Sequence, residues 1–174
     1  MKGATSYKSK LKTYAFIDAS NIIYGARAEG WLIDQGKLFK FLKNRFNSSI
    51  IFFYYGKDSN NPKKIKFLSL LKKFGFTLRV KEIKRYGKKS KANCDVDLTM
   101  DMLIYSKSYK RAIVLTGDGD FTPLFKYLIS QKKEIIIISS PKRTAKELKS
   151  LISGKFINFD SLRYLLEYKK RGGP

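Results

Sequence analysis

Residues 112–128 have the sequence AIVLTGDGDFTPLFKYL, and the pattern changes twice within this stretch. It begins with an apolar run at residues 112–115, which has the length and character of a buried strand. A turn rich in Gly and Asp follows, and Leu124 and Leu128 then repeat at helical spacing. A strand, a turn and a helix in this order form the unit from which α/β proteins are built.

The same alternation continues on both sides of this stretch. Apolar or alternating segments predict further strands at residues 14–17, 50–55, 76–83, 135–139 and 156–158. Helical spacing and cap residues predict helices between them, starting at Asp34 and Asn61, with one more at residues 96–105. Thr144 and Glu147 fit a capping box that opens another helix, and Asp160 fits the cap of a last helix that ends at Tyr168. The basic segment 85–93 predicts a loop. We therefore expect a three-layer α/β/α sandwich, Rossmann-like, with a central, mainly parallel sheet of five to six strands.

Length and composition limit the remaining choices. The 174 residues suffice for one domain, which we place at residues 13–168, between a basic extension at 1–12 and a tail at 169–174. An apolar fraction of 43% excludes a disordered chain, and no apolar run reaches the roughly 18 residues that span a bilayer. The single Cys94 excludes an intramolecular disulfide and a Cys-based zinc site, and the absence of His excludes triad and His–zinc chemistry.

The net charge points to a polyanionic partner. Lys and Arg number 37 and Asp and Glu 14, so the net charge is +23. A domain this cationic attracts nucleic acid through its phosphates. A membrane surface, or a genome rich in Lys codons, would explain the charge as well. We expect RNA as the partner, no membrane association, and a reducing cytoplasm as the location, because Cys94 is unpaired. A homo-oligomer is compatible with the sequence.

The acidic residues gather where sites form in parallel sheets. Asp18 ends the first predicted strand, and Asp118 and Asp120 follow the fourth, while Asp95 and Asp101 belong to the helix near 96–105. Ligands bind beyond the carboxyl ends of parallel strands, at the point where the strand order reverses. Carboxylates gathered at one edge repel each other unless a cation neutralises them. Their hard oxygens suit Mg²⁺ or Mn²⁺.

Each of these acids also has a purely structural interpretation. Asp18 could cap the turn after its strand, and Asp118 could belong to an ordinary turn with Asp120 as the cap of the next helix. Asp97 fits a solvated helix face. Asn21 could cap a helix or orient a phosphate of a substrate.

Three better-known acidic sites fit less well. Haloacid-dehalogenase phosphatases have a similar first motif, but they need a second acid two residues after the nucleophile, where this chain has Ser20. A metal-dependent adhesion site needs Ser where Ile22 stands. The segment 116–128 lacks the alternating acids and the late Glu of an EF-hand.

Three segments together resemble the motifs of the NYN domain, in the LabA-like branch of the PIN-like ribonuclease superfamily. These segments are FIDASN at 16–21, CDVDLTMDM at 94–102 and LTGDGDFTPL at 115–124. Their order and spacing match over residues 13–160. This chain has Cys94, Thr116 and Gly119 where the family commonly has Val, Ser and Ser, and these changes remove no carboxylate.

The resemblance implies a PIN-like fold and metal-dependent RNA cleavage. It further implies an acidic centre made of Asp18, Asp95, Asp118 and Asp120, which would hold Mg²⁺ or Mn²⁺, with Asn21 and Asp101 in support. We therefore expect a ribonuclease, in the first place an endonuclease, that hydrolyses phosphodiester bonds at this centre. A catalytically inactive RNA-binding module and a metal-dependent phosphatase or nucleotidase are the alternatives.

A basic segment precedes Asp95 and is the predicted RNA contact. Its Lys and Arg side chains suit a phosphate backbone and its Tyr an unpaired base; the residues are Lys84, Arg85, Tyr86, Lys88, Lys89 and Lys91. A solvated run of charge is the structural alternative for this segment. Tyr24 is a weaker candidate for stacking, and Trp31 fits the core better.

Overall fold

A six-stranded sheet with the order β3-β2-β1-β6-β7-β8 forms the centre of the protein in the computed structural model. The structure describes residues 11–57, 61–82, 84–86, 89–91, 94–152 and 154–169. Every pairing in this sheet is parallel, which confirms the predicted class. The strands are β1 (Thr13–Asp18), β2 (Ser48–Lys57), β3 (Thr77–Glu82), β6 (Arg111–Leu115), β7 (Glu134–Ser139) and β8 (Phe156–Asn158).

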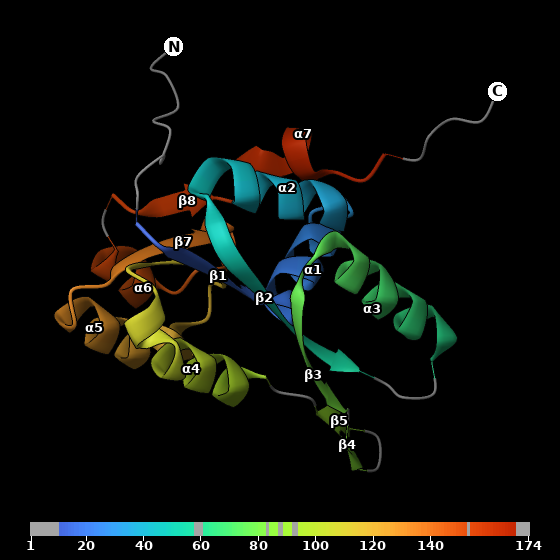
Figure 1. Cartoon of the computed structure of the whole chain (residues 1–174). Helices are drawn as coiled ribbons and strands as arrows, with labels where there is room; N and C mark the ends of the chain where they lie inside the picture. Colours follow the sequence, from blue (N-terminus) through green and yellow to red (C-terminus); the bar gives the residue numbers. More distant parts are fainter. Residues whose placement is uncertain are drawn as a thin grey trace.

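Helices cover both faces of the sheet. They are α1 (Ala19–Ala28), α2 (Gln35–Phe46), α3 (Pro62–Phe74), α4 (Asp95–Ile104), α5 (Thr122–Ser130), α6 (Lys146–Leu151) and α7 (Arg163–Leu166). Helices α1, α2, α3 and α7 pack on one face, and α4, α5 and α6 on the other (Figure 1). The strand order reverses between β1 and β6, so the carboxyl ends of these two neighbours form a switch point, the place where ligands commonly bind in open α/β sheets.

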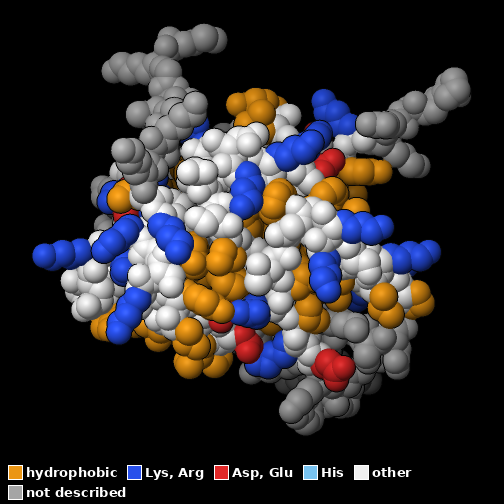
Figure 2. Space-filling view, in the orientation of Figure 1, with side chains coloured by type: hydrophobic (Ala, Val, Ile, Leu, Met, Phe, Trp, Pro, Cys, Tyr) orange, Lys and Arg blue, Asp and Glu red, His pale blue; other side chains and the backbone are white. Residues whose placement is uncertain are grey.

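The cationic charge is spread over the surface. Lys and Arg side chains are distributed across the whole face seen in Figure 2, where carboxylates are few. None of the helices within the described ranges has the length and apolar character needed to cross a membrane. Most of the predicted N-terminal extension and C-terminal tail, at residues 1–10 and 170–174, lies outside the described residues.

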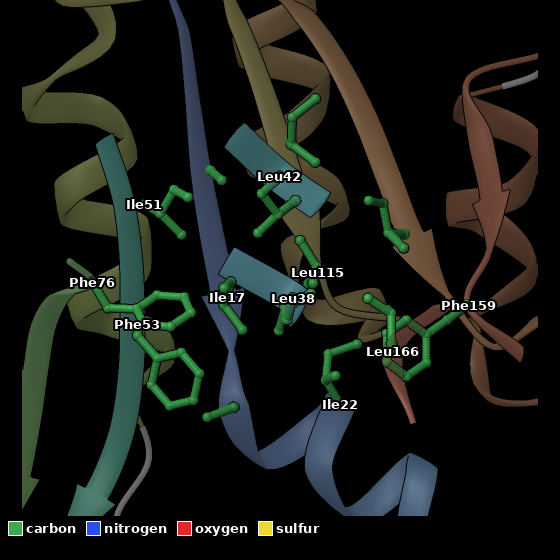
Figure 3. Packing of buried hydrophobic residues seen from close by; sticks show 14 of the residues in the cluster. Ile17, Ile22, Leu38, Leu42, Ile51, Phe53, Phe76, Leu115, Phe159 and Leu166 are labelled. Atoms are coloured by element: carbon green, nitrogen blue, oxygen red, sulfur yellow. The ribbon is translucent and has the colours of Figure 1, made fainter. Parts of the chain in front are cut away.

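Two apolar layers hold the sheet between its helices. On one face Ile17, Leu38 and Leu42 pack with Phe53 and Leu115, and Figure 3 shows their side chains converging. The largest of the opposite layer's buried side chains are aromatic: Phe16, Phe52, Tyr54, Tyr109, Phe121 and Phe125. Each fully buried side chain of this size contributes about 1.5–3 kcal/mol to the free energy of unfolding. This core fixes β1 and β6, and therefore the residues that end them.

Local signals placed several elements correctly. Asp34 caps α2 by accepting a hydrogen bond from the Lys37 amide at 3.0 Å, and Asn61 caps α3 in the same way. Gly75 ends α3 in the left-handed conformation, with a φ of 101°. Trp31 is buried in the core, as expected.

Other expectations were wrong. The segment predicted as a loop at 85–93 contains an antiparallel hairpin, in which β4 (Lys84–Tyr86) pairs with β5 (Lys89–Lys91). Thr144 does not form a capping box, because its hydroxyl donates to the Ser140 carbonyl at 2.7 Å and α6 begins after Ala145 without a side-chain cap. The last helix starts as a 3₁₀ turn at Asp160–Leu162 and ends at Leu166, two residues before the expected Tyr168. Helix α1 had not been predicted.

Candidate active site

Asp18 occupies the end of β1 and the start of α1 at once. Asp18 is the last residue of the strand, and its side chain caps the helix by accepting a hydrogen bond from the Asn21 amide at 3.2 Å. Its second oxygen accepts a hydrogen bond from the Thr116 hydroxyl at 3.1 Å. The capping role and the site role are therefore compatible, because each uses a different oxygen of the carboxylate.

A chain of hydrogen bonds ties the first motif to the third. The Asn21 side-chain oxygen accepts from the Gly117 amide at 3.1 Å, and the Asp118 amide donates to the Thr116 hydroxyl at 3.3 Å. The Asp120 amide then donates to the Asp118 carboxylate at 2.9 Å, which closes a 3₁₀ turn at Gly119–Phe121. Because β1 and β6 are direct neighbours, these bonds fix the two motifs at one edge of the sheet.

The third motif is packed closely against the segment before α6. A Cβ added to Gly117 would lie 2.6 Å from the Ser139 hydroxyl and 2.7 Å from the Arg143 carbonyl, so only Gly fits here. The Gly117 carbonyl also accepts a hydrogen bond from the Ala145 amide at 3.0 Å. A Cβ at Gly119 would lie 2.7 Å from a carboxylate oxygen of Glu147. A further acid therefore lies beside the turn.

The charge of Asp95 acts on Asp18. Burial raises the pKa of Asp18 above its usual 3.8, and the negative charges of Asp95 and Asp118 raise it further. The hydrogen bonds from Asn21 and Thr116 oppose this rise in pKa. Burial, followed by the charge of Asp97 and smaller effects of Asp18 and Asp95, raises the pKa of the Cys94 thiol to about 11. Asp95 and Asp118 thus come from two further segments, and each repels a negative charge on Asp18.

Two other acids of the second motif have partners elsewhere. Asp101 is buried and accepts hydrogen bonds from the Tyr54 hydroxyl at 3.0 Å and from Nε of Arg79 at 2.7 Å. Asp97 forms an exposed ion pair with Lys81 at 3.0 Å, as its interpretation as a solvated residue predicted. Asp101 therefore anchors α4 to β2 and β3.

The donor set fits a hard divalent cation in its chemistry. Asp18, Asp95 and Asp118 offer carboxylate oxygens, which Mg²⁺ and Mn²⁺ prefer, and a cation relieves the repulsion that Asp95 and Asp118 exert on a charged Asp18. Among the residues that the structure describes, no group of three or more His, Cys, Asp or Glu side chains is arranged so that it could hold a metal ion. Binding a cation would therefore require these side chains to move closer together.

The predicted RNA contacts belong to the segment of the β4–β5 hairpin, which precedes α4 and Asp95 in the sequence. Figure 1 shows the hairpin beyond the end of β3, near the start of α4. Lys88 lies outside the described residues. The backbone of Lys84, Arg85, Tyr86, Lys89 and Lys91 forms the paired strands.

A pocket with a volume of about 590 Å³ opens beside the first motif. Ala19 and Ser20, which follow Asp18 directly, lie in its wall, as does the exposed Tyr24. Sequence reasoning named Tyr24 but not the pocket. It also missed Thr116 and Glu147 as neighbours of the acids. The Thr after β6 was visible as a departure from the family motif, whereas Glu147 had been assigned to a capping box.

Comparisons with known proteins agree with this architecture. The family model of the NYN domain matches residues 12–162. The chain is 25% identical over 167 residues to Low amplitude and bright protein LabA from Synechococcus elongatus, and the alignment covers 91% of this chain and 89% of that protein. A crystal structure of a protein of unknown function from Vibrio parahaemolyticus superposes with a TM-score of 0.78 at 23% identity. It covers 94% of this chain and 99% of the other.

Proposed function

Because the chain belongs to the NYN domain family of PIN-like nucleases, we propose that it is a metal-dependent ribonuclease that hydrolyses phosphodiester bonds within RNA. The observation that supports this proposal is the set of hydrogen bonds that join the first motif to the third. Asp18 at the end of β1 and Asn21 in the first turn of α1 are hydrogen-bonded to Thr116 and Gly117, which follow β6, while Asp95 and Asp118 act on Asp18 electrostatically.

In this proposal the acidic residues bind the metal ion, and their polar neighbours orient them. Asp18, Asp95 and Asp118 would hold Mg²⁺ or Mn²⁺, which when bound activates a water and neutralises charge on the scissile phosphate. Thr116 and Asn21 orient Asp18 and the third motif through their hydrogen bonds. Asp120 is exposed and would join these acids in holding the ion.

The binding of RNA rests on charge. The chain has a net charge of +23, and the basic hairpin lies near the start of α4 and therefore near Asp95. We propose that Lys84, Arg85, Tyr86, Lys88, Lys89 and Lys91 contact the substrate backbone and an unpaired base. A cytoplasmic location is part of the same proposal, because Cys94 is a free thiol.

A second candidate function has an observation of its own. Within the described ranges the acids are not gathered into a three-residue metal site. An RNA-binding module without catalysis would need no such group. A phosphatase acting on small substrates would need one, and the charge of +23 favours a long polyanion over a small substrate.

Asp118→Asn tests the proposed activity. We expect cleavage of a labelled single-stranded RNA in Mg²⁺ or Mn²⁺, none in excess chelator, and a rate at least about 100-fold lower in the variant, since several kcal/mol of charge stabilisation depend on the ion. The matched control is Asp97→Asn, which removes the same charge from an exposed ion pair and should cleave like the parent. Thermal unfolding in chelator verifies that both variants fold.

The alternatives make different predictions in the same experiment. Full activity in chelator, or unchanged cleavage by Asp118→Asn, would refute the metal mechanism at this site. Metal-dependent hydrolysis of a small phosphoester without cleavage of RNA would favour a phosphatase. RNA binding without cleavage under any metal condition would favour the inactive module.

A further inference from the structure

The pocket beside the first motif is built from three stretches of the chain, at residues 19–35, 55–67 and 168. Helix α1 forms one wall, the end of β2 and the first turns of α3 form another, and residues around Leu32 and Tyr168 close the pocket. Its volume of about 590 Å³ lies within the roughly 300–1,000 Å³ of sites that enclose small ligands. It therefore has room for one nucleotide but not for a stacked duplex.

Aromatic side chains line this pocket, and two of them are largely exposed. Tyr24 is 65% exposed and Tyr168 is 52% exposed, whereas Tyr55 and Phe67 lie deeper and pack against the core. The pKa of Tyr55 is raised by burial first and then by the nearby Tyr24. Exposed rings around a hollow are the feature on which unpaired bases stack.

Cations stand around the same pocket. Arg27 comes from the end of α1, and Lys63 and Lys64 come from the first turn of α3. In the part of the chain that the structure describes, none of the three forms an ion pair with a carboxylate. The two lysines stand where the dipole of α3 also favours negative charge. Their charges are therefore available to an anionic ligand.

A polar group in the wall lacks a partner. Gln35 is only 8% exposed and lines the pocket, and its side-chain oxygen has no hydrogen-bond partner among the described residues. This oxygen is shielded from solvent, so a ligand that brings a donor would satisfy it once the Gln35 side chain turns towards the pocket. The amino and ring N–H groups of nucleobases are such donors.

We propose that this pocket, here called the α1–α3 pocket, binds one unstacked nucleotide of a single-stranded RNA. The base packs against Tyr24 and Tyr55, and the flanking phosphates contact Arg27, Lys63 and Lys64. This assignment rests on the proposed function in requiring RNA as the partner. Because Ala19 and Ser20 in the wall follow Asp18 directly, a strand held here passes the acids at the end of β1. The protein therefore prefers unpaired RNA to a duplex.

Tyr24→Ala tests the stacking half of the proposal. Binding of a fluorescently labelled single-stranded oligoribonucleotide is measured by anisotropy in chelator, so that cleavage does not interfere. We expect about 5- to 150-fold weaker binding of the single strand, the range found when one aromatic ring that stacks on a base is removed, and little change for a duplex of the same sequence. The matched control is Tyr127→Ala on α5, which removes an exposed tyrosine outside the pocket.

A double variant on α3 tests the phosphate half. Lys63→Ala with Lys64→Ala should weaken binding and lower the slope of log affinity against log salt by about 0.7 for each phosphate that is no longer neutralised. Lys72→Ala with Lys73→Ala removes equal charge from the other end of the same helix and should leave the slope unchanged.

The outcomes separate this inference from the proposed function. A parent protein that binds neither form of RNA would refute the proposed function itself. If the parent binds RNA and Tyr24→Ala binds it equally well, the pocket assignment alone is overturned. The same holds if Tyr24→Ala loses as much affinity for the duplex as for the single strand. Adenosine 5′-monophosphate that binds as tightly as the oligonucleotide would assign the pocket to a free nucleotide and overturn it too. These results do not depend on cleavage, because they are obtained in chelator.

Discussion

At the scale of single residues, Asp18 combines a cap with a candidate metal ligand, and its pKa makes the combination testable. The Asp18 carboxyl has a raised pKa in the folded state and a pKa near 3.8 in the unfolded state. Between these two values, Asp18 is protonated in the folded state and ionised in the unfolded state. The stability of the parent therefore falls as the pH rises from 3.8 to the raised value, and stays lower above it. We expect Asp18→Asn, measured by thermal unfolding in chelator, to be at least as stable as the parent at neutral pH.

The pH dependence distinguishes this effect from a simple cap. The advantage of Asp18→Asn should shrink as the pH falls towards 3.8, because the parent is then protonated as well. Asp34→Asn is the matched control, since Asp34 also caps a helix by accepting an amide hydrogen bond. It should gain nothing at neutral pH and lose up to about 1 kcal/mol, because a carboxylate favours a helix start. A large loss of stability in Asp18→Asn would contradict the electrostatic account.

Asp101 shows how a residue of a functional motif can act through packing. Asp101→Ala leaves the hydroxyl of Tyr54, itself 1% exposed, without its acceptor and removes the partner of Arg79. We expect a loss of about 2–3 kcal/mol in the free energy of unfolding, measured with urea. Asp97→Ala breaks an exposed ion pair and should cost at most about 1 kcal/mol. Equal losses in the two variants would argue against the buried network.

At the scale of elements, the sequence predicted what its hydrophobic pattern and its caps determine. The runs that became β1 and β6 are buried on both faces, so continuous apolar segments marked them. Helix α1 was missed because no loop separates it from β1, and Asp18 both ends the strand and caps the helix. The β4–β5 hairpin was missed because its three-residue strands are basic and show no apolar alternation.

The hairpin itself carries a prediction. Neutralising Lys88, Lys89 and Lys91 together should weaken RNA binding and lower the salt slope by about 0.7 for each phosphate of a single strand that these lysines neutralise in the parent. The matched control neutralises Lys107, Lys110 and Lys132, which are exposed near the starts of β6 and β7, at the opposite edge of the sheet from Asp18. Equal slopes for the two triple variants, measured by anisotropy over a salt series, would place the RNA on another surface.

At the scale of the whole molecule, topology was predictable and the pocket was not. The general rule for parallel sheets pointed to the acids at the carboxyl ends of strands, including Asp18 and Asp118. That β1 and β6 are direct neighbours is shown by the structure. The α1–α3 pocket depends on Tyr24, Gln35, Lys63 and Tyr168 meeting in space. No local sequence pattern links residues so far apart. In the sequence alone, Tyr24 and Tyr168 look like any other surface tyrosines.

The net charge leads to a prediction about the whole fold. A charge of +23 destabilises the compact state through self-repulsion, and salt screens it, since the Debye length falls from about 30 Å at 0.01 M to about 8 Å at 0.15 M. We expect the melting temperature without RNA and in chelator to rise over this range, by about 2–4 °C for each kcal/mol of repulsion removed. The affinity for RNA should fall over the same range, because counterion release weakens. Repeating the titration with sucrose at equal osmolality controls for effects other than ionic strength. A melting temperature that falls with salt would mean that ion pairs such as Arg111–Glu134, at 2.7 Å, outweigh the repulsion, and that the excess of cations does not destabilise the fold.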